Sequence, residues 1–172
     1  MAAQDDVGAR ILDAALDILR ARGPKAVTMQ AIVEATGIAK TTIYRRHPNR
    51  RALLTAALET LGERPSAPPS ASRRERLRWA IAQSVDVISH GIGAGGFAAL
   101  LTDDDPDFSG AFRSILVTYR RQAIDALDMD DTEAETVIDM IVGSYVAELA
   151  RTGSVSTDWA ARVAKMLGAK PN

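Results

Sequence analysis

Side chains that bind nucleic acids are concentrated in one short stretch of the chain, residues 40–46. The segment KTTIYRR places donors around a single apolar residue, Ile43. Arginine, lysine and threonine bind base edges and phosphates, while Ile43 can face inward and anchor the segment against another helix. The candidate base-reading residues are Lys40, Thr41, Thr42 and Arg45. This composition predicts a helix that reads DNA in the major groove.

A short helix and a tight turn precede this segment and would fix its orientation. Thr28 is suited to cap a helix that presents Ile32 inward, and Gly37 is suited to end it. Two short helices joined by a glycine-containing turn form a helix-turn-helix. The candidate phosphate-binding residues around it are Thr28, Tyr44, Arg46, His47 and Arg50.

The spacing of these residues resembles a known motif. The matching positions are Thr28, Ile32, Ala35, Gly37, Ile38, Ala39, Thr42, Ile43, Tyr44 and Leu53. Through them, residues 8–61 resemble the tetracycline-repressor (TetR) family of bacterial regulators. The resemblance implies that the protein is a homodimer, that its partner is double-stranded operator DNA, and that a small-molecule effector controls it.

Two positions depart from the family's usual pattern. Arg50 stands where the family usually has Lys, and an arginine keeps the charge and donors for a phosphate. His47 stands where the family usually has Phe or Trp. Its imidazole is expected either to reach the DNA backbone or to loosen the packing between the first and fourth helices.

The remaining sequence predicts further helices. A Pro- and Ser-rich break at 62–72 is followed by apolar residues at helical spacing, and the Gly-rich run 91–96 is expected to interrupt them. Thr132 and Glu135 are expected to form a capping box. Since no strand pattern competes, we predict an all-α fold. Residues 1–62 would form a three-helix helix-turn-helix DNA-binding domain and residues 63–172 a helical ligand-binding and dimerisation domain.

The last two helical segments carry more apolar side chains than one side of a small core needs. Self-association would bury them, and in the resembling family the final two helices pair across a dimer. The alternative is that they pack within one chain. The candidate interface residues are Ile138, Ile141, Val142, Tyr145, Trp159, Val163 and Met166.

A cavity for a small, largely apolar effector is expected among the C-terminal helices, because of the resemblance and a set of apolar residues with a few polar groups. Ordinary core packing is the alternative for each of them. The candidate lining residues are Trp79, Gln83, Phe97, Phe112, Tyr119 and Met140.

Composition excludes several other classes of protein. The net charge is −1, but residues 1–62 hold nine Lys and Arg against six Asp and Glu, so positive charge gathers where DNA would bind. The chain has no Cys, only two separated His residues and no catalytic motif, which predicts no enzyme, no metal and no cofactor. We find no secretory signal and no run of about 18 apolar residues, which predicts a cytoplasmic protein without a membrane partner.

Together these features predict a DNA-binding transcriptional regulator. A homodimeric repressor, released from its operator by a small, largely apolar ligand, is favoured because a bound dimer near a promoter excludes polymerase. A TetR-like activator is one alternative. The other is a helical interaction protein that has lost DNA binding, against which the retained Lys40, Tyr44, Arg45 and Arg46 argue.

Overall fold

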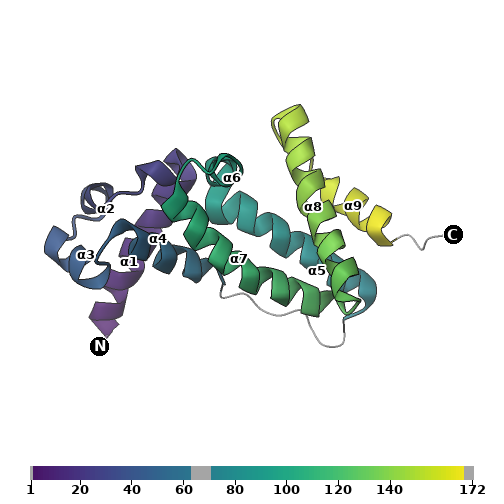
Figure 1. The fold of residues 1–172 in the computed structure, drawn as a ribbon, viewed down its shortest axis with the longest axis horizontal. Helices are drawn as coiled ribbons and strands as arrows, with labels where there is room; N and C mark the ends of the chain where they lie inside the picture. The colour runs from purple at the N-terminus through teal and green to yellow at the C-terminus, as the bar shows by residue number, and fades with distance from the viewer. Residues whose placement is uncertain (1, 63–70, 169–172) are drawn as a thin grey trace. The chain divides into compact units, whose positions relative to one another are not determined.

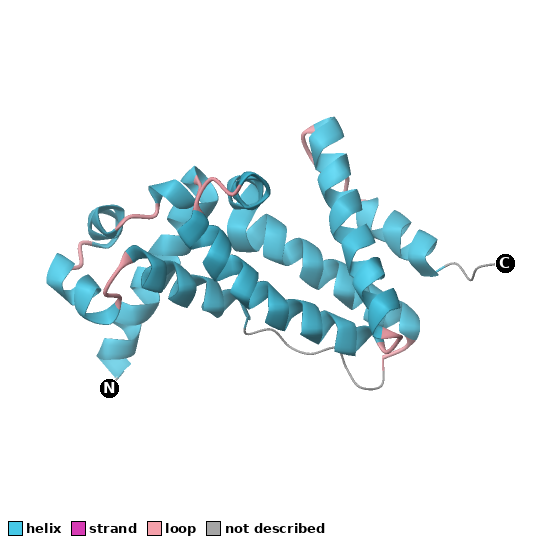
Figure 2. Cartoon of the chain, in the orientation of Figure 1, coloured by secondary structure: helices cyan, strands magenta, loops and turns pink. Residues whose placement is uncertain are grey.

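The computed structural model describes residues 2–62 and 71–168, which form helices, turns and loops without a strand (Figure 2). The main helices are α1 (Ala2–Arg22), α2 (Met29–Thr36), α3 (Lys40–Arg46), α4 (Arg50–Glu59), α5 (Arg73–Asp86), α6 (Gly93–Thr102), α7 (Pro106–Leu127), α8 (Asp131–Thr152) and α9 (Trp159–Gly168) (Figure 1). Short turns of other helix types are η1 (Pro24–Ala26), η2 (Thr60–Gly62) and η3 (Val87–Ile92). The predicted all-α fold is confirmed.

The chain forms two compact units. The first unit comprises residues 1–64 and 88–116, and the second comprises residues 65–87 and 117–172. The first unit thus adds α6 and the first half of α7 to the four N-terminal helices. The division into domains at residue 62 stays a prediction, and most of the Pro- and Ser-rich break, residues 63–70, lies outside the described residues.

The core of the first unit holds the helix-turn-helix in place. Ile11 of α1, Ile32 of α2 and Ile43 of α3 are fully buried, as are Leu53 and Leu58 of α4. Each helix contributes an apolar stripe at helical spacing, and burial of these stripes against one another drives their packing. α1 lies against α2, α4 and α6. The orientation of α3 therefore depends on the residues that fix α2 and α4.

Both ends of α2 are capped by the residues that the sequence predicts. The Thr28 hydroxyl accepts a hydrogen bond from the Ala31 backbone N–H at 3.1 Å, so Thr28 caps α2 as predicted. Gly37 ends α2 with φ of 69°, a left-handed conformation that suits glycine. Asn49 caps α4 through a 2.8 Å hydrogen bond from the Ala52 N–H. These caps fix both ends of α2 and the start of α4, the two helices that flank α3 in the chain.

The Gly-rich run interrupts the regular α-helix, because it contains the end of a π-helical turn and Gly93, whose φ of 69° is left-handed. α5 ends at Asp86, the π-helical turn η3 follows, and α6 begins at Gly93. Such a turn leaves backbone carbonyls poorly paired. Arg20 of α1 satisfies two of them, because its Nε donates to the His90 carbonyl at 2.5 Å and the Gly91 carbonyl at 3.2 Å. A side chain distant in sequence thus stabilises the irregular turn.

The run of helical residues Arg73–Thr102 is long and apolar enough to cross a membrane by length and composition alone. A single candidate of this kind is weak evidence for a membrane span. Ile81, Ile88 and Ile92 are buried within the described units and account for much of its apolar character. Core helices of water-soluble proteins pass the same test, so the segment carries no membrane assignment.

The second unit is built from α5, α8, α9 and the second half of α7. Leu77 and Ile81 of α5 are buried, as are Ile138 and Ile141 of α8 and Trp159 of α9. α5 packs against both α8 and α9. The predicted capping box of α8 was wrong, because the Asp130 carboxylate, one residue before the helix, already accepts from the N–H of Thr132 and Glu133.

Candidate nucleic-acid interface

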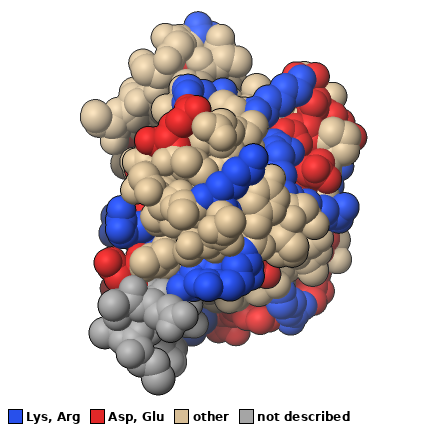
Figure 3. Space-filling model, turned by 90° about the vertical axis from the view of Figure 1, so that its left-hand side faces the viewer, with Lys and Arg blue, Asp and Glu red and all other residues tan. Residues whose placement is uncertain are grey.

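α3 presents a row of donors to solvent. Lys40, Thr41, Tyr44 and Arg45 are exposed, Thr42 is half-buried, and Ile43 is buried beneath them. The Lys40 Nζ lies 5.8 Å from the centre of the Tyr44 ring, within the range of a cation–π contact. The side that carries α2 and α3 shows Lys and Arg across its middle, with Asp and Glu toward its edges (Figure 3). The arrangement gives α3 an outer face that can reach base edges.

Arg46 and His47 lie deeper than the residues before them. Both are half-buried, and a Cβ added at Gly8 of α1 would lie 3.3 Å from Arg46 Nη1. Burial first, and then the positive charge of Arg46, lower the pKa of His47 below its ordinary value. His47 is therefore mainly uncharged at neutral pH, and it could bind a phosphate as a neutral N–H donor only.

Arg50 points into the first unit. Its side chain is 25% exposed and pairs with Asp105, whose side chain is 6% exposed. Arg50 Nη1 donates to Asp105 Oδ1 at 3.0 Å, and Nη2 donates to Asp105 Oδ2. Nε donates to the Val27 carbonyl at 2.8 Å and Nη2 to the Pro24 carbonyl at 2.7 Å. This placement differs from the one expected for a phosphate-binding residue.

Asp105 was not singled out from the sequence. Its Oδ1 also accepts a hydrogen bond from the Phe108 backbone N–H at 3.2 Å, as an N-cap residue does at the start of a helix, here α7. Burial alone would raise the pKa of Asp105, but the hydrogen bonds from Arg50 and Phe108 lower it below its ordinary value. Pro106, the next residue, could have indicated from the sequence that α7 begins here, since proline is common at the first position of a helix.

The six candidate effector-binding residues belong to both units. Phe97 and Phe112 are in the first unit, where the buried Phe112 ring stacks on Phe108 with centres 5.9 Å apart. Met140 is 56% exposed and lines a groove on α8 and α9. The other three are half-buried in the second unit: Trp79, Gln83 and Tyr119.

The candidate dimer residues are divided between core and surface. Ile138, Ile141, Tyr145 and Trp159 are buried within the second unit, and the Tyr145 and Trp159 rings meet edge to face at 5.4 Å. Val142 and Val163 are half-buried, and Met166 is 75% exposed. The four buried residues thus pack inside the chain, which was the alternative to a dimer interface. The surface between α8 and α9 is an open groove of about 830 Å³ lined by residues that include Met140, Ser144, Arg151, Trp159, Val163 and Met166.

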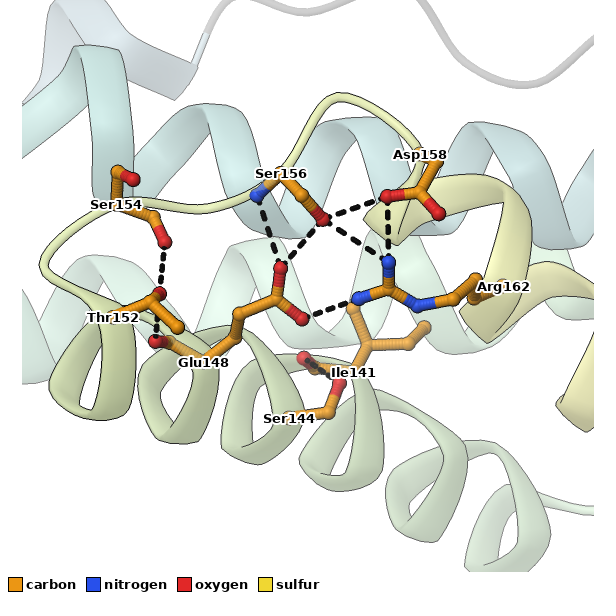
Figure 4. Close-up of polar contacts among 8 residues, drawn as sticks. All are labelled: Ile141, Ser144, Glu148, Thr152, Ser154, Ser156, Asp158 and Arg162. Atoms are coloured by element: carbon orange, nitrogen blue, oxygen red, sulfur yellow. Dashed lines mark hydrogen bonds and ion pairs between the residues drawn. The ribbon is translucent and has the colours of Figure 1, made fainter.

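A polar network fixes the turn beside this groove (Figure 4). Glu148 of α8 is buried and accepts hydrogen bonds from the Ser156 N–H at 2.9 Å and the Ser156 hydroxyl at 2.6 Å. Arg162 of α9 pairs with both Glu148 and Asp158. Hydrogen bonds from Ser156 are the main reason why the pKa of Glu148 is lowered. The network holds α9 in place, so the groove exists before any partner arrives.

Across the described ranges 2–62 and 71–168, no group of three or more His, Cys, Asp or Glu residues is arranged to hold a metal ion. The polar clusters are instead ion pairs and helix caps. Among these described residues, the exposed hydrogen-bond donors of α3 are the group whose chemistry suits binding of another molecule.

Comparison with known proteins agrees with this geometry. Residues 11–57 match the family model for bacterial regulatory proteins of the tetR family. A stretch of 85 residues is 35% identical to the HTH-type transcriptional repressor KstR from Rhodococcus jostii and covers 47% of this chain. The chain spans only 40% of the length of that relative.

Solved structures share the fold at low sequence identity. A transcriptional regulator from Rhodococcus sp. RHA1 matches with a TM-score of 0.69 and 14% identity, over 92% of each chain. A TetR regulator from Agrobacterium tumefaciens matches with a TM-score of 0.68 and 18% identity, over 98% of this chain and 92% of its own. The matched family consists of regulators and not enzymes, as predicted. Residues 11–57 therefore carry a DNA-binding region similar to that of the tetR family of bacterial regulatory proteins, and the chain as a whole shares the fold of these regulators.

Proposed function

We propose that this protein is a homodimeric transcriptional repressor that binds operator DNA through α3. The observation that carries the proposal is the exposed row of Lys40, Thr41, Tyr44 and Arg45 on a short helix held by a capped helix-turn-helix. A helix of this kind fits the major groove of B-form DNA, where each base pair displays a distinct set of donors and acceptors.

The contacts divide by chemistry. Lys40, Thr41, Thr42 and Arg45 read bases, because they occupy the reading segment and carry groups that bind base edges. Thr28, Tyr44, Arg46 and His47 bind phosphates, which orients the protein without reading sequence. The half-buried positions of Arg46 and His47 limit them to a phosphate that lies close to α1 and the end of α3.

The second copy of the chain docks on the groove between α8 and α9. The exposed Met140 and Met166 and the half-buried Val163 give this groove an apolar floor, while Arg151 and Lys165 add charge. Burial of such a surface is favourable at about 25 cal/mol per Å². Two copies are needed because one short helix contacts few base pairs, and a dimer doubles the contact on two half-sites.

We assign repression to the dimer because a dimer bound near a promoter excludes polymerase. The similar protein KstR carries the description of a repressor. Activation is the alternative mode of regulation. We further propose that the protein acts in the cytoplasm and that a small, largely apolar effector releases it from DNA, by binding the free conformation better than the DNA-bound one. A thermal-shift screen in which no apolar small molecule stabilises the protein would count against the effector.

The test is selection of duplexes from random DNA by the purified protein, with competitor DNA present and the salt concentration varied. Enrichment of a palindromic sequence supports a dimeric DNA-binding regulator and provides its operator. If no sequence is enriched even at low salt, the proposal fails, and an interaction protein that has lost DNA binding becomes the better assignment.

A further inference from the structure

Arg50 joins the two ends of the helix-turn-helix. The carbonyls of Pro24 and Val27, to which it donates, lie just before α2, and Arg50 itself is the first residue of α4, just after the turn that follows α3. One side chain therefore connects the entry and the exit of the DNA-reading segment. The angle between α2 and α4, and with it the position of α3, depends on this connection.

The guanidinium has little left to offer a phosphate. Four of its five N–H groups are used, two on backbone carbonyls and two on Asp105. The remaining one is on Nη1, and a carboxylate oxygen of Asp107 lies 3.7 Å from that nitrogen. A phosphate would approach two carboxylates, and like charges at short range repel. The geometry is that of an internal contact.

Asp105 orients the guanidinium. Its two oxygens accept from two different nitrogens of Arg50, which fixes the plane of the guanidinium, and its own position is fixed by the Phe108 N–H at the start of α7. A lysine offers one nitrogen and could not make the two carbonyl contacts and the two-point carboxylate contact together.

We propose that Arg50 and Asp105 act together as positioning residues for DNA recognition. They hold the start of α4 against Pro24 and Val27 and so determine how α3 meets the base edges. The inference rests on the proposed function, and it replaces the phosphate-binding role that the sequence predicted for Arg50.

The experiment compares Arg50→Lys, Arg50→Gln, Asp105→Asn and the double variant Arg50→Gln/Asp105→Asn. The probes are the duplex that the wild-type protein recovers from random DNA and a random duplex of equal length. Asp104→Asn is the matched control, because it removes the same charge from the neighbouring residue, whose pair with Lys25 is exposed. Each variant is first checked for cooperative thermal unfolding and is then assayed well below its midpoint.

Positioning predicts that all three single variants bind the recovered duplex about tenfold or more weakly, the scale of one lost charge-assisted hydrogen bond. Binding to random DNA and its salt dependence should change little. The double variant should be no weaker than the weaker single variant, since both changes break one contact. Asp104→Asn should match the wild type.

Phosphate binding predicts a different pattern. Arg50→Lys and Asp105→Asn would bind like the wild type, and Arg50→Gln would lose affinity for both duplexes alike. The slope of log K against log salt would then fall by about 0.9, the value of one phosphate contact. That pattern would overturn the inference while leaving the proposed function intact.

Hydrogen exchange tests the inference without DNA. Amides of α2 and α3 should exchange faster in Arg50→Lys and Asp105→Asn than in the wild type and Asp104→Asn, because their support is lost. Unchanged exchange would overturn the positioning role. If the wild-type protein recovers no duplex, the proposed function fails by itself, and the exchange result still decides whether the pair supports α3.

Discussion

Positively charged residues of the first unit have two different uses. Lys40 and Arg45 extend into solvent from α3, whereas Arg20 and Arg50 are hydrogen-bonded to backbone carbonyls of neighbouring elements. A count of Lys and Arg therefore overstates the charge that is available to DNA. The electrostatic attraction between this protein and random DNA should be modest and should weaken steeply with salt.

Arg45 is the residue with which to test base reading. Replacement by Ala removes an exposed group from the reading helix without disturbing the core. We expect a loss of about 1 to 3 kcal/mol for the selected duplex and a relaxed preference at one position. Competition between the selected duplex and scrambled duplexes measures the loss of affinity and the change in sequence preference. Arg74→Ala, which removes an exposed charge from α5, is the control, and equal losses on all duplexes would assign Arg45 to phosphate.

His47 should make folding stability depend on pH. Its pKa is lowered in the folded protein by burial and by Arg46, so the unfolded chain binds a proton first as the pH falls. The free energy of unfolding should therefore decrease as the pH falls from the ordinary His pKa of about 6.5 toward the lower folded value, and level off below it. Urea unfolding between about pH 7.5 and about pH 5.5 measures the effect.

His47→Phe supplies the comparison for this measurement, since Phe or Trp is usual at this position in the family. The variant should lose part of the decline in stability below about pH 6.5. A decline of the same size in both proteins would show that other groups cause it.

At the scale of elements, α6 depends on a close contact that its glycines permit. A Cβ added at Gly96 would lie 2.9 Å from the Ile92 Cβ and 3.4 Å from the Phe108 ring. Both neighbours are fully buried and have no room to move. At Gly95 the nearest atom would be the Gly23 Cα at 3.6 Å, which is an ordinary contact.

Gly96→Ala should therefore lower the free energy of unfolding by about 1 to 2 kcal/mol, because the strain of overpacking exceeds the gain in helix propensity. Gly95→Ala should leave it unchanged or raise it by up to about 1 kcal/mol. Urea unfolding of the two variants checks the contrast. Equal effects would mean that α6 can shift and that its contact with Phe108 is loose.

At the scale of the whole molecule, the groove on α8 and α9 is the candidate surface for self-association. Met166→Glu places a charge where we propose that a second copy docks, and Met166 is 75% exposed in the single chain. The variant should keep its fold, lose self-association and bind the selected duplex at least tenfold more weakly. Sedimentation velocity and DNA binding measure these outcomes.

Leu101→Glu is the matched control for Met166→Glu, because Leu101 is 70% exposed but lies on α6, outside the groove. It should leave sedimentation unchanged. A Met166→Glu protein that remains dimeric would place the interface elsewhere, and a wild-type protein that is monomeric at all concentrations would exclude the proposed homodimer.

The sequence by itself determined the helix-turn-helix, because its signals are local. Thr28 caps a helix with the N–H three residues away, Gly37 supplies a left-handed turn, and the donors of α3 surround one buried isoleucine. Caps, turns and helical period act within a few residues, so the chain order displays them directly. The all-α fold followed for the same reason.

Only the tertiary structure decided which residues these helices meet. Arg50 pairs with Asp105, 55 positions away, and Arg20 supports the π-turn at His90, 70 positions away. In α8, Ile141 is buried while Met140 beside it is exposed. Helical period shows that a face is apolar, but it does not show whether the same chain or a second copy covers it. Partners, burial and pKa shifts arise from packing between distant segments, and packing exists only in three dimensions.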